Sequence, residues 1–480
     1  MHKLQRQMIE SELVDIVGPE FVLTDEADRA VYGVDYFWVP RMLVDRGSSF
    51  PIPDFVALPG DTEEVAAIVR LANVHRIPVI AWGGGSGSQG GVVPVYGGIT
   101  LDLKRLSDIA EINVTAQTVT AGAGVNGYEL ESALNARGLT LPHYPASVHS
   151  ATLGGYLACR GSGVLSTKYG KAEDLVLSIQ VVLPSGEVMR TLPVPSHAAG
   201  PGILDFFVGS EGSYGIITEA TMSVEQLPEE RRFQSLIFND LADGLEAGRQ
   251  IMHERLEPCV IRLYDEPSSV KLIANALGTH MDSGVYMVLG FDGRKSLVDL
   301  QENRALAICR DLGAQELGAE HGSRWWKHRY DFYFPPHVFD LPMMFGTLDT
   351  VCTYDKIANL YATKKRALEE KYAEWGLQYY AHFSHWYPWG VMVYDRFVIA
   401  DPPRDPGKAL ALHNEIWNLA VRTSISCGGV LNDHHGVGLK LARLMREQYG
   451  TAFQVLEGLK RSLDPRNILN PGKMGFGPTT

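Results

Sequence analysis

Residues 82–98 of the chain read WGGGSGSQGGVVPVYGG. Within this stretch, residues 85–90 fit the pattern G-x-G-x-x-G, which is typical of dinucleotide-binding loops in parallel α/β folds. In those folds a helix begins at the last glycine and holds the ligand's pyrophosphate at its N-terminus. Pro94 and the pair Gly97-Gly98 are incompatible with a helix here. The sequence therefore argues against a Rossmann fold, while its glycines remain suited to an anion, because consecutive backbone N–H groups without side chains form a concave anion site.

The flanking sequence indicates an α+β fold. Upstream, residues 54–59 (DFVALP) and 77–82 (IPVIAW) read as strands, and residues 61–77 between them read as a helix. Asp61 is a good N-cap for this helix, and Glu64 completes a capping box. Downstream, short apolar runs separated by glycines predict further strands and few long crossovers.

Length and composition predict a soluble protein of two or three domains. The chain has 480 residues, of which 45% are hydrophobic and 21% charged, and one hydrophobic core seldom organises so long a chain. Glycine clusters give way to longer helical patterns after Gln226. We therefore predict domains at residues 1–226 and 227–425, with residues 426–480 returning to the first domain.

Charge and cysteine content restrict the partners and the compartment. The formal net charge of −13 argues against nucleic acid or an anionic membrane as the main partner. We expect no transmembrane helix, because no run of eighteen apolar residues occurs, and no signal peptide. The five cysteines are scattered and never in C-x-x-C spacing, which is typical of a reducing compartment. We expect a cytoplasmic location and a small-molecule substrate. The candidate assembly is a homodimer.

Four ordered motifs resemble the FAD-binding domain of the vanillyl-alcohol oxidase/PCMH flavoprotein superfamily. They are residues 56–87, residues 152–163 (TLGGYLACRGSG), residues 168–188 and residues 209–220 (GSEGSYGIITEA). Residues 463–474 (LDPRNILNPGKM) are similar to the C-terminal signature of that superfamily. The resemblance implies a two-subdomain PCMH-type FAD-binding domain and an α+β cap domain, with an antiparallel sheet flanked by helices.

The same resemblance implies which residues bind FAD. The glycines of the first loop approach the pyrophosphate, its serines donate hydrogen bonds, and later motifs contact the flavin, ribose or adenine. The implied set is Gly83, Gly84, Gly85, Ser86, Gly87, Ser88, Pro145, Ser147, Thr152, Gly154, Gly155, Arg160, Ser162, Gly163, Glu211, Gly212 and Ile217. In covalent members a histidine in or near the first loop tethers the flavin. This loop has none, so we expect dissociable FAD, with a tether from the cap domain left open.

The C-terminal half most resembles the alkylglycerone-phosphate (alkyldihydroxyacetonephosphate) synthases. The similar segments are IRLYD, RWWKHRYD, HFSHWYPWGVMVYDRF and GGVLNDHHGVG, which begin at residues 261, 324, 382 and 428. The resemblance implies Tyr387 as the catalytic tyrosine, with His385 in the same segment. It departs at position 433, where Asp433-His434-His435 stands in place of three histidines. This departure puts the ether-lipid reaction in doubt but not the flavoenzyme interpretation.

The residues of this loop also support acid–base chemistry on their own. Two histidines on a glycine-flanked loop are suited to proton transfer near neutral pH, and Asp433 can orient one of them. The alternative is a helix cap with ordinary polar histidines. A metal bound through His385 and His434 is disfavoured, because adjacent histidines rarely share an ion and the ligand count is incomplete.

Two arginines and an aromatic region are candidates for substrate contact. Arg262 and Arg329 suit a carboxylate or phosphate, since guanidinium binds such groups with two parallel hydrogen bonds; surface ion pairs are the equal alternative. The aromatic residues of 324–340 and 385–390 suit an aromatic or long apolar substrate, or form the core of the cap domain.

We therefore predict an FAD-dependent oxidoreductase that oxidises a hydroxyl-bearing substrate (an alcohol, phenol or hydroxy acid) by hydride transfer to flavin N5. Tyr387, with His434 or His435, removes or stabilises a proton. The alternative is a redox-neutral transferase of the alkylglycerone-phosphate-synthase type, which uses a flavin N5 adduct. A flavin-binding protein without catalysis is the third alternative.

Overall fold

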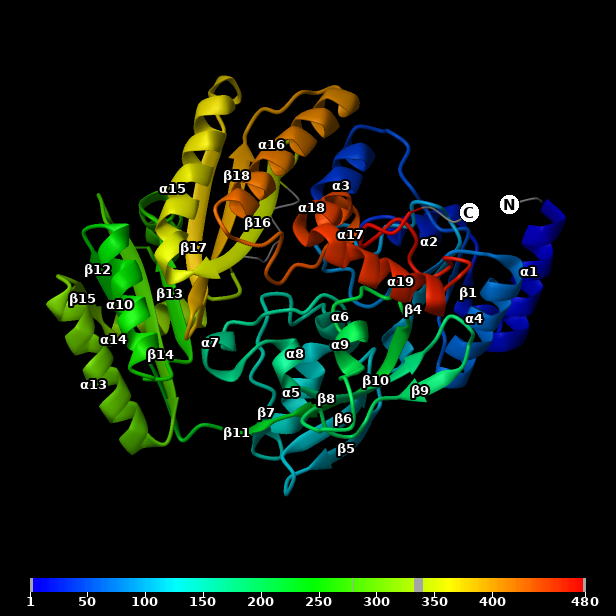
Figure 1. The fold of residues 1–480 in the computed structure, drawn as a ribbon, viewed down its shortest axis with the longest axis horizontal. Coiled ribbons are helices and arrows are strands. Elements are labelled where there is room, and N and C mark those ends of the chain that lie inside the picture. The colour runs from blue at the N-terminus through cyan, green and yellow to red at the C-terminus, as the bar shows by residue number, and fades with distance from the viewer. Residues whose placement is uncertain (1–2, 279, 332–339, 478–480) are drawn as a thin grey trace.

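The computed structural model describes residues 3–278, 280–331 and 340–477. Three main sheets organise these residues, and helices pack against them (Figure 1). The first two sheets lie toward the N-terminal half of the chain, and the third is built from residues after 229.

The first sheet has four strands in the order β1-β2-β4-β3. Its strands are β1 (Val22–Leu23), β2 (Phe55–Ala57), β3 (Val79–Trp82) and β4 (Ile99–Asp102). Strands β2, β4 and β3 run parallel, and β1 pairs antiparallel with β2. The helices of this region are α1 (Lys3–Val17), α2 (Glu26–Val31), α3 (Trp38–Asp45) and α4 (Thr62–His75), with 3-10 turns η1 (Pro19–Phe21) and η2 (Leu103–Arg105).

Helix α4 begins at the predicted N-cap, Asp61, but the predicted capping box is not formed, because the Glu64 carboxylate bonds to the N–H of Gly60 and not to that of Asp61. The side chain of Asp61 accepts a hydrogen bond from the backbone N–H of Glu64, and the Glu64 carboxylate accepts one from the N–H of Gly60. The apolar face of the helix, including Val65, Ile68 and Val69, is buried. This face fixes the helix against the sheet and sends the chain through β3 into the glycine loop.

The second sheet is antiparallel and has the order β5-β6-β10-β8-β9. Its strands are β5 (Ile109–Asn113), β6 (Thr118–Gly122), β8 (Val176–Val182), β9 (Val188–Arg190) and β10 (Ile216–Ser223), and β7 (Leu139–Thr140) pairs separately with β11 (Glu225–Gln226). Short helices connect them: α5 (Gly127–Asn135), α6 (Leu153–Ala158), α7 (Ser166–Tyr169), α8 (Ala172–Leu175) and α9 (Leu204–Phe207).

The third sheet has seven strands, all paired antiparallel, in the order β15-β12-β14-β13-β17-β18-β16. They are β12 (Glu230–Phe238), β13 (Val260–Tyr264), β14 (Val285–Gly293), β15 (Gln315–Gly318), β16 (Met344–Thr353), β17 (Gln378–Tyr387) and β18 (Gly390–Ile399). We call this sheet with its helices the cap domain. It confirms the predicted α+β class, with an antiparallel sheet flanked by helices.

Both faces of the cap sheet are covered. On β14, Met287 and Leu289 belong to one buried cluster, while Tyr286 and Val288 belong to another, as expected from the alternation of side chains along a strand. The first cluster includes residues of α10 (Leu241–His253), α13 (Lys295–Asp311), α15 (Tyr354–Lys371) and α16 (Pro406–Ser426). The second includes residues of η3 (Ser269–Ile273, a π-helix), α12 (Ala274–Leu277) and α14 (Ala319–Lys327). Helix α11 (Glu266–Ser268) precedes η3, and η5 (Ala373–Trp375) follows α15.

The C-terminal segment leaves the cap domain and ends against the first sheet (Figure 1). It contains α17 (Gly438–Leu441), η6 (Ala442–Leu444), α18 (Met445–Tyr449), η7 (Gly450–Ala452) and α19 (Phe453–Leu463). The backbone N–H of Val79 in β3 donates to the carbonyl of Ile468, and the Asn470 amide donates to the carbonyls of Gly91 and Glu211. Residues near the end of the chain thus hold the glycine loop in place.

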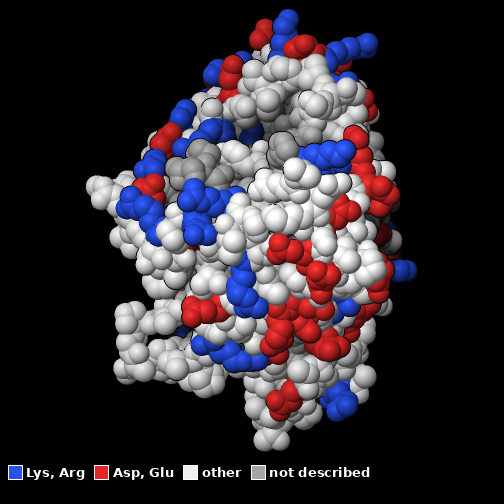
Figure 2. Space-filling view, turned by 90° about the vertical axis from the view of Figure 1, so that its right-hand side faces the viewer, with Lys and Arg blue, Asp and Glu red and all other residues white. Residues whose placement is uncertain are grey.

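No helix among the described residues is long and apolar enough to cross a membrane. On the face shown in Figure 2, acidic side chains gather in one area while Lys and Arg side chains lie scattered among uncharged ones.

Candidate functional site

A cavity of about 490 Å³ lies between the glycine loops and the cap domain. Its wall comes from the first sheet, the second sheet, cap strands β13, β16, β17 and β18, and the loop before α17. Of the seventeen residues that the resemblance assigns to FAD, all except Arg160 line this cavity. They are Gly83, Gly84, Gly85, Ser86, Gly87, Ser88, Pro145, Ser147, Thr152, Gly154, Gly155, Ser162, Gly163, Glu211, Gly212 and Ile217.

The glycine loop after β3 reaches β4 without forming a helix, in agreement with the sequence analysis. Its second glycine allows close packing, since a Cβ on Gly84 would lie 1.8 Å from the carbonyl oxygen of Ser150. Gly85 adopts a φ of +61°, which favours glycine. The loop therefore lies directly against residues 150–152 and forms one wall of the cavity with them.

Several buried polar atoms on the cavity wall have no hydrogen-bond partner within the described ranges. Among them are the hydroxyl oxygens of Ser88, Tyr156 and Ser162 and Oε1 of Gln89. Buried polar groups are normally hydrogen-bonded, so these atoms indicate a ligand that carries many donors and acceptors. The ribitol, pyrophosphate and ring edges of FAD offer such groups, and the residues present fit this cofactor.

Glu211 and Arg160 have different surroundings. The Glu211 carboxylate accepts hydrogen bonds from the backbone N–H groups of Val437 and Gly438. Burial raises the pKa of Glu211 to about 7, although these hydrogen bonds oppose the shift. Arg160 lies outside the cavity wall, half-exposed, with its guanidinium 4.0 Å from Glu173 and 3.8 Å from Asp205.

Cap strands and the loop of residues 432–436 form the opposite wall. The cap residues that line the cavity are Arg262, Thr347, His382, Ser384, His385 and Tyr394, and the loop supplies His434 and His435. The rings of His434 and His435 are 4.1 Å apart, and the ring of Tyr394 lies 5.2 Å from that of His435. The ring of His385 lies 5.1 Å from that of His434. A cluster of proton-carrying side chains thus faces the glycine loops.

Asp349, in the centre of β16, organises this loop. Its fully buried carboxylate accepts hydrogen bonds from the backbone N–H groups of Asp433 and His434, at 2.8 and 2.9 Å. It also contacts Nδ1 of His435 at 2.7 Å, Nδ1 of His434 at 3.2 Å and the amide of Asn432 at 2.8 Å. Burial opposes ionisation of this carboxyl, but the two imidazoles outweigh burial and hold its pKa well below the usual range.

Asp433 joins the loop to β17. Its Oδ2 lies 3.4 Å from Nδ1 of His385 and 3.1 Å from Nδ1 of His434. Its carbonyl oxygen accepts a hydrogen bond from Nζ of Lys171 at 2.7 Å. Burial raises the pKa of Asp433, but the charge of Lys171 and the imidazole hydrogen bonds outweigh this and lower it. Asp433 is therefore a buried carboxylate that orients His434, one of the two loop histidines, as the sequence analysis allows, and in addition contacts His385.

The histidines differ in charge because their surroundings differ. Burial lowers the pKa of His434, but Asp349 and Asp433 outweigh it and raise the pKa to about 9. Burial dominates at His385 and lowers its pKa to about 4, despite the hydrogen bond with Asp433. Burial also lowers the pKa of His435, which Asp349 only partly opposes. At neutral pH the site therefore holds one imidazolium beside two neutral imidazoles.

Tyr387 does not line the cavity. Its hydroxyl donates a hydrogen bond to Oδ1 of Asp433 at 3.2 Å. His385 and His434 contact the other carboxylate oxygen, Oδ2. Its ring stacks on that of Trp389, which is half-exposed. Among the described residues of the cap domain, the tyrosine that lines the cavity is Tyr394, on the neighbouring strand β18.

Arg262 lines the cavity, whereas Arg329 packs 3.8 and 4.2 Å from the rings of Trp326 and Tyr330 and does not line it. Trp325 is fully buried and belongs to the cap core. Of the aromatic region at 324–340, residues 332–339 lie outside the described residues.

Two groups of ligand atoms are close enough to hold a metal: Asp349, His434 and His435 form one, and His385, Asp433 and His434 form the other. In both groups the imidazole Nδ1 atoms already contact the carboxylates. Imidazole–carboxylate hydrogen bonding accounts for the spacing in each group.

Sequence reasoning missed Asp349, Tyr394, His382 and His143. Both ring nitrogens of His143 are buried on the cavity wall without a partner among the described residues. One signal was available for Asp349, a lone carboxylate within the apolar strand MFGTLDTVCT. The others depend on strand pairing and loop packing that no local pattern specifies.

Comparison with known proteins supports the cofactor directly. A family model described as "FAD binding domain" matches residues 53–192, and one described as "FAD linked oxidases, C-terminal domain" matches residues 227–474. An uncharacterized FAD-linked oxidoreductase of Escherichia coli (strain K12), YgcU, is 30% identical over 98% of each chain. An alkyldihydroxyacetonephosphate synthase structure superposes with a TM-score of 0.80 at 26% identity, covering 97% of this chain and 84% of that one. A p-cresol methylhydroxylase structure with bound substrate gives a TM-score of 0.80 at 18% identity, covering 99% and 98%, and shares the fold.

Proposed function

The chain belongs to the family of FAD-linked oxidases, and from this premise we propose that it oxidises a hydroxyl-bearing small molecule held between the FAD site and the cap domain. The observation that carries the proposal is the pair His385 and His434, which share Asp433 and line one cavity with the glycine loops. FAD, when bound, supplies a two-electron acceptor that takes up a hydride at N5. The remaining steps fall to side chains of this chain.

His385 is the proton acceptor in this proposal. It is neutral at physiological pH because burial lowers its pKa to about 4. Its Nδ1 faces Asp433, so Nε2 is the nitrogen available to a substrate in the cavity. The carboxylate fixes the ring orientation, and the imidazole receives the hydroxyl proton as the carbon–hydrogen bond breaks.

His434 is the electrostatic partner. Its Nδ1 contacts both Asp349 and Asp433, and its pKa of about 9 keeps it charged at neutral pH. An imidazolium beside the substrate stabilises the negative charge that develops on the substrate oxygen. Groups whose pKa values are pushed apart by their surroundings are typical acid and base partners. Tyr394 completes this wall, and its ring lies close to the rings of both loop histidines.

A second candidate is the redox-neutral transfer reaction of the synthase class, supported by the 26% identity and TM-score of 0.80 with the synthase structure. Asp433 stands where that resemblance implies a histidine, which favours the oxidation.

The test is anaerobic mixing of the FAD-loaded protein with 2-hydroxy acids, phenolic alcohols and aliphatic alcohols. Oxidation predicts bleaching of the oxidised flavin absorbance by at least one class, reversed by oxygen or an artificial acceptor. Absence of bleaching with every class, together with turnover of an acyl-glycerone phosphate, would establish the transferase instead. Bound FAD without either reaction would indicate a flavin-binding protein.

A further inference from the structure

The N-terminal segment of residues 35–41 lies along the glycine loop and forms a part of the main cavity wall that the sequence motifs did not indicate. Asp35, Tyr36 and Arg41 of this segment line the cavity. The backbone N–H of Tyr36 donates to the carbonyl of Gly87 at 2.9 Å. The segment therefore faces the same space that the glycine loop presents to FAD.

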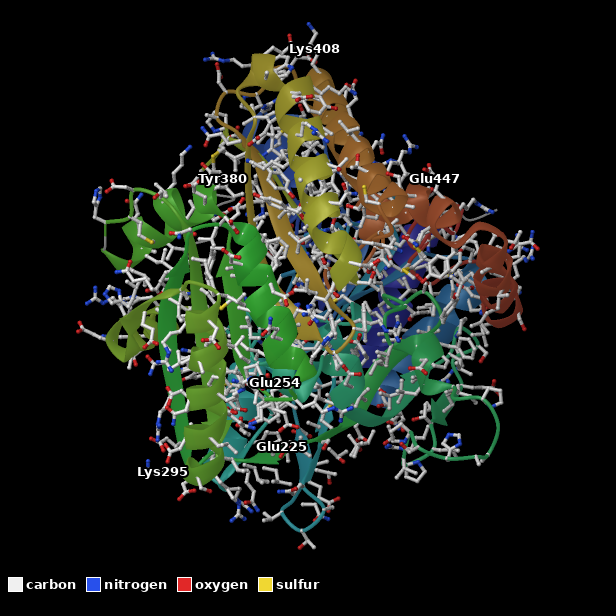
Figure 3. The ribbon with its side chains drawn as sticks, turned by 60° about the vertical axis from the view of Figure 1, so that its left-hand side comes forward. Glu225, Glu254, Lys295, Tyr380, Lys408 and Glu447 are labelled. Atoms are coloured by element: carbon white, nitrogen blue, oxygen red, sulfur yellow. The ribbon has the colours of Figure 1, made fainter. Side chains whose placement is uncertain are left out.

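Contacts from both sides fix this segment in place. Nε of Arg41 donates to the carbonyl oxygen of Asp35 at 2.7 Å. Nε1 of Trp38 donates at 2.8 Å to the carbonyl of Met343, which directly precedes β16. Helix α3 also lies beside α16, whose first turn carries the labelled Lys408 (Figure 3). The position of Asp35 is thus set by the FAD-binding loop and by the cap domain together.

Asp35 presents an unpartnered polar atom to the glycine loop. Its side chain is 1% exposed, and its Oδ1 accepts a hydrogen bond from the backbone N–H of Phe37 at 2.9 Å. Its Oδ2 is buried and has no hydrogen-bond partner among the described residues. A Cβ on Gly87 would lie 3.7 Å from this oxygen and would meet nothing else within 4 Å. Because buried polar atoms are normally hydrogen-bonded, Oδ2 indicates a partner that the described part of the chain does not supply.

The surroundings of Asp35 favour its neutral form. The charged groups that act on it are Arg41 on α3 and Lys473 in the C-terminal segment, and residues 82–91 of the glycine loop carry no charged side chain. Burial raises the pKa of Asp35 to about 7, although the N–H of Phe37 and the two cations oppose the shift. Near neutral pH this carboxyl group therefore changes between its neutral and its charged form.

We propose that Asp35 binds FAD as a neutral carboxyl group whose O–H donates to an oxygen of the cofactor, so that FAD binding takes up a proton. The pyrophosphate of FAD is negatively charged, and a charged carboxylate on the wall of the same cavity would repel it. A neutral carboxyl group instead offers a hydrogen-bond donor. Proteins use a raised pKa in this way to keep a carboxyl group neutral as a donor. The inference concerns the cofactor and does not depend on the reaction proposed above.

The proposal fixes the sign of a pH dependence. Bound FAD favours the neutral form, so the pKa of Asp35 is higher in the complex than in the apoprotein. Below a pH of about 7 the carboxyl group is neutral in both states, and it does not make the affinity depend on pH. Above that pH binding requires proton uptake, so the Kd for FAD rises, approaching about tenfold for each pH unit. A carboxylate that accepted a hydrogen bond from FAD would give the opposite slope.

The first test measures FAD binding to the apoprotein by flavin fluorescence, from about pH 6 to about pH 9. Asp35→Asn keeps an acceptor for the N–H of Phe37 and a donor toward the loop. Its Kd should lie within about threefold of the wild-type value at about pH 6 and be at least about tenfold lower than the wild-type value at about pH 9. Asp45→Asn, at an exposed position at the end of α3, is the matched control and should retain the wild-type slope. A wild-type Kd that falls or stays constant above neutrality, or a slope unchanged in Asp35→Asn, would overturn the proposal.

Two other buried groups titrate in the same range and need their own comparison. The pKa of Glu211 is raised to about 7 and that of Lys473 is lowered to about 8, in both cases by burial. Both carboxylate oxygens of Glu211 already accept backbone N–H groups. Glu211→Gln should therefore retain most of the slope that Asp35→Asn loses, and the reverse result would assign the proton to Glu211 and refute the role of Asp35. Calorimetry in buffers of different ionisation enthalpy counts the protons: at about pH 8, wild type should take up about one proton more than Asp35→Asn.

The second test uses the FAD-loaded protein and needs no release of the cofactor. At about pH 8 the infrared spectrum of the wild type should contain the absorption of a protonated carboxyl group that shifts in heavy water and is absent from Asp35→Asn. A difference spectrum that shows only carboxylate bands would refute the proposal. Both tests stand apart from turnover, because a protein that oxidises no hydroxyl compound can still show this linkage, and an active oxidase can lack it.

Discussion

Oδ1 of Asp349 lies 2.7 Å from Nδ1 of His435, although 86 residues separate the two in sequence. The same carboxylate accepts the backbone N–H groups of Asp433 and His434. A cap-domain strand thus fixes the loop that lines one cavity with the glycine loops. This relationship makes Asp349 a positioning residue that also supplies half of the negative charge around His434.

Replacement of Asp349 by asparagine should therefore disorder the loop and lower the pKa of His434. Loss of one partner from a buried ion pair costs about 3–5 kcal/mol, so we expect a lower unfolding midpoint and at least a hundredfold slower flavin reduction. Thermal melts and anaerobic stopped-flow measurements check both effects. Asp355→Asn, at an exposed position on α15, is the control. A variant that melts and reduces its flavin like the wild type would show that Asp349 does not organise the loop.

Asp349 also illustrates what sequence can and cannot predict here. The glycine loops could be located because close packing and anion binding leave local signals, such as Gly83 to Gly87 and the absence of a following helix. The contact between Asp349 and His435 depends on strand pairing and loop closure over long sequence distances, which local patterns do not encode. The same limit applies to Tyr394, which lies on the cavity wall because β18 pairs with β17. A register irregularity between Phe383 and His385 further breaks the simple alternation along β17.

The rate of flavin reduction should depend on pH through His385 and His434. The reaction needs neutral His385, whose pKa is about 4, and charged His434, whose pKa is about 9. The rate should therefore fall as the pH drops through about 4 and again as it rises through about 9, with a plateau between. Stopped-flow reduction at a saturating substrate concentration measures both limbs. His434→Gln should remove the alkaline limb; an unchanged limb in that variant would assign it to another group.

Tyr394 and Tyr387 give a direct comparison of a cavity residue with a sequence-predicted one. Tyr394→Phe removes the hydroxyl of a residue that lines the cavity and whose ring lies near both loop histidines, so we expect a tenfold to hundredfold slower reduction, about 1.4–2.7 kcal/mol. Tyr387→Phe removes a hydroxyl that contacts Oδ1 of Asp433 and does not belong to a cavity-lining residue. The reduction rate of this variant should stay within about threefold of wild type. Limiting reduction rates of the two variants decide the question. The reverse order would restore Tyr387 as the catalytic tyrosine.

The packing of the glycine loop predicts a selective loss of FAD. In Gly84→Ala, the added methyl group would meet the carbonyl oxygen of Ser150 at 1.8 Å. The loop has to move away from residues 150–152, and the cavity wall moves with it. We expect less than a tenth of the wild-type flavin content after purification, measured by visible absorbance after acid precipitation, with the yellow colour of the wild type in the supernatant.

Gly458→Ala provides the matched control for this change. Gly458 lies within α19, has an ordinary negative φ, and a Cβ there would meet nothing within 4 Å. Alanine is favoured over glycine in a helix interior by up to about 1 kcal/mol, so this variant should keep its flavin and melt at or slightly above the wild-type temperature. Full flavin retention in Gly84→Ala would mean that the loop bends without cost to the cofactor site. Loss of flavin with an unchanged melting temperature for the apoprotein would show that Gly84 acts on the cofactor site and not on folding as a whole.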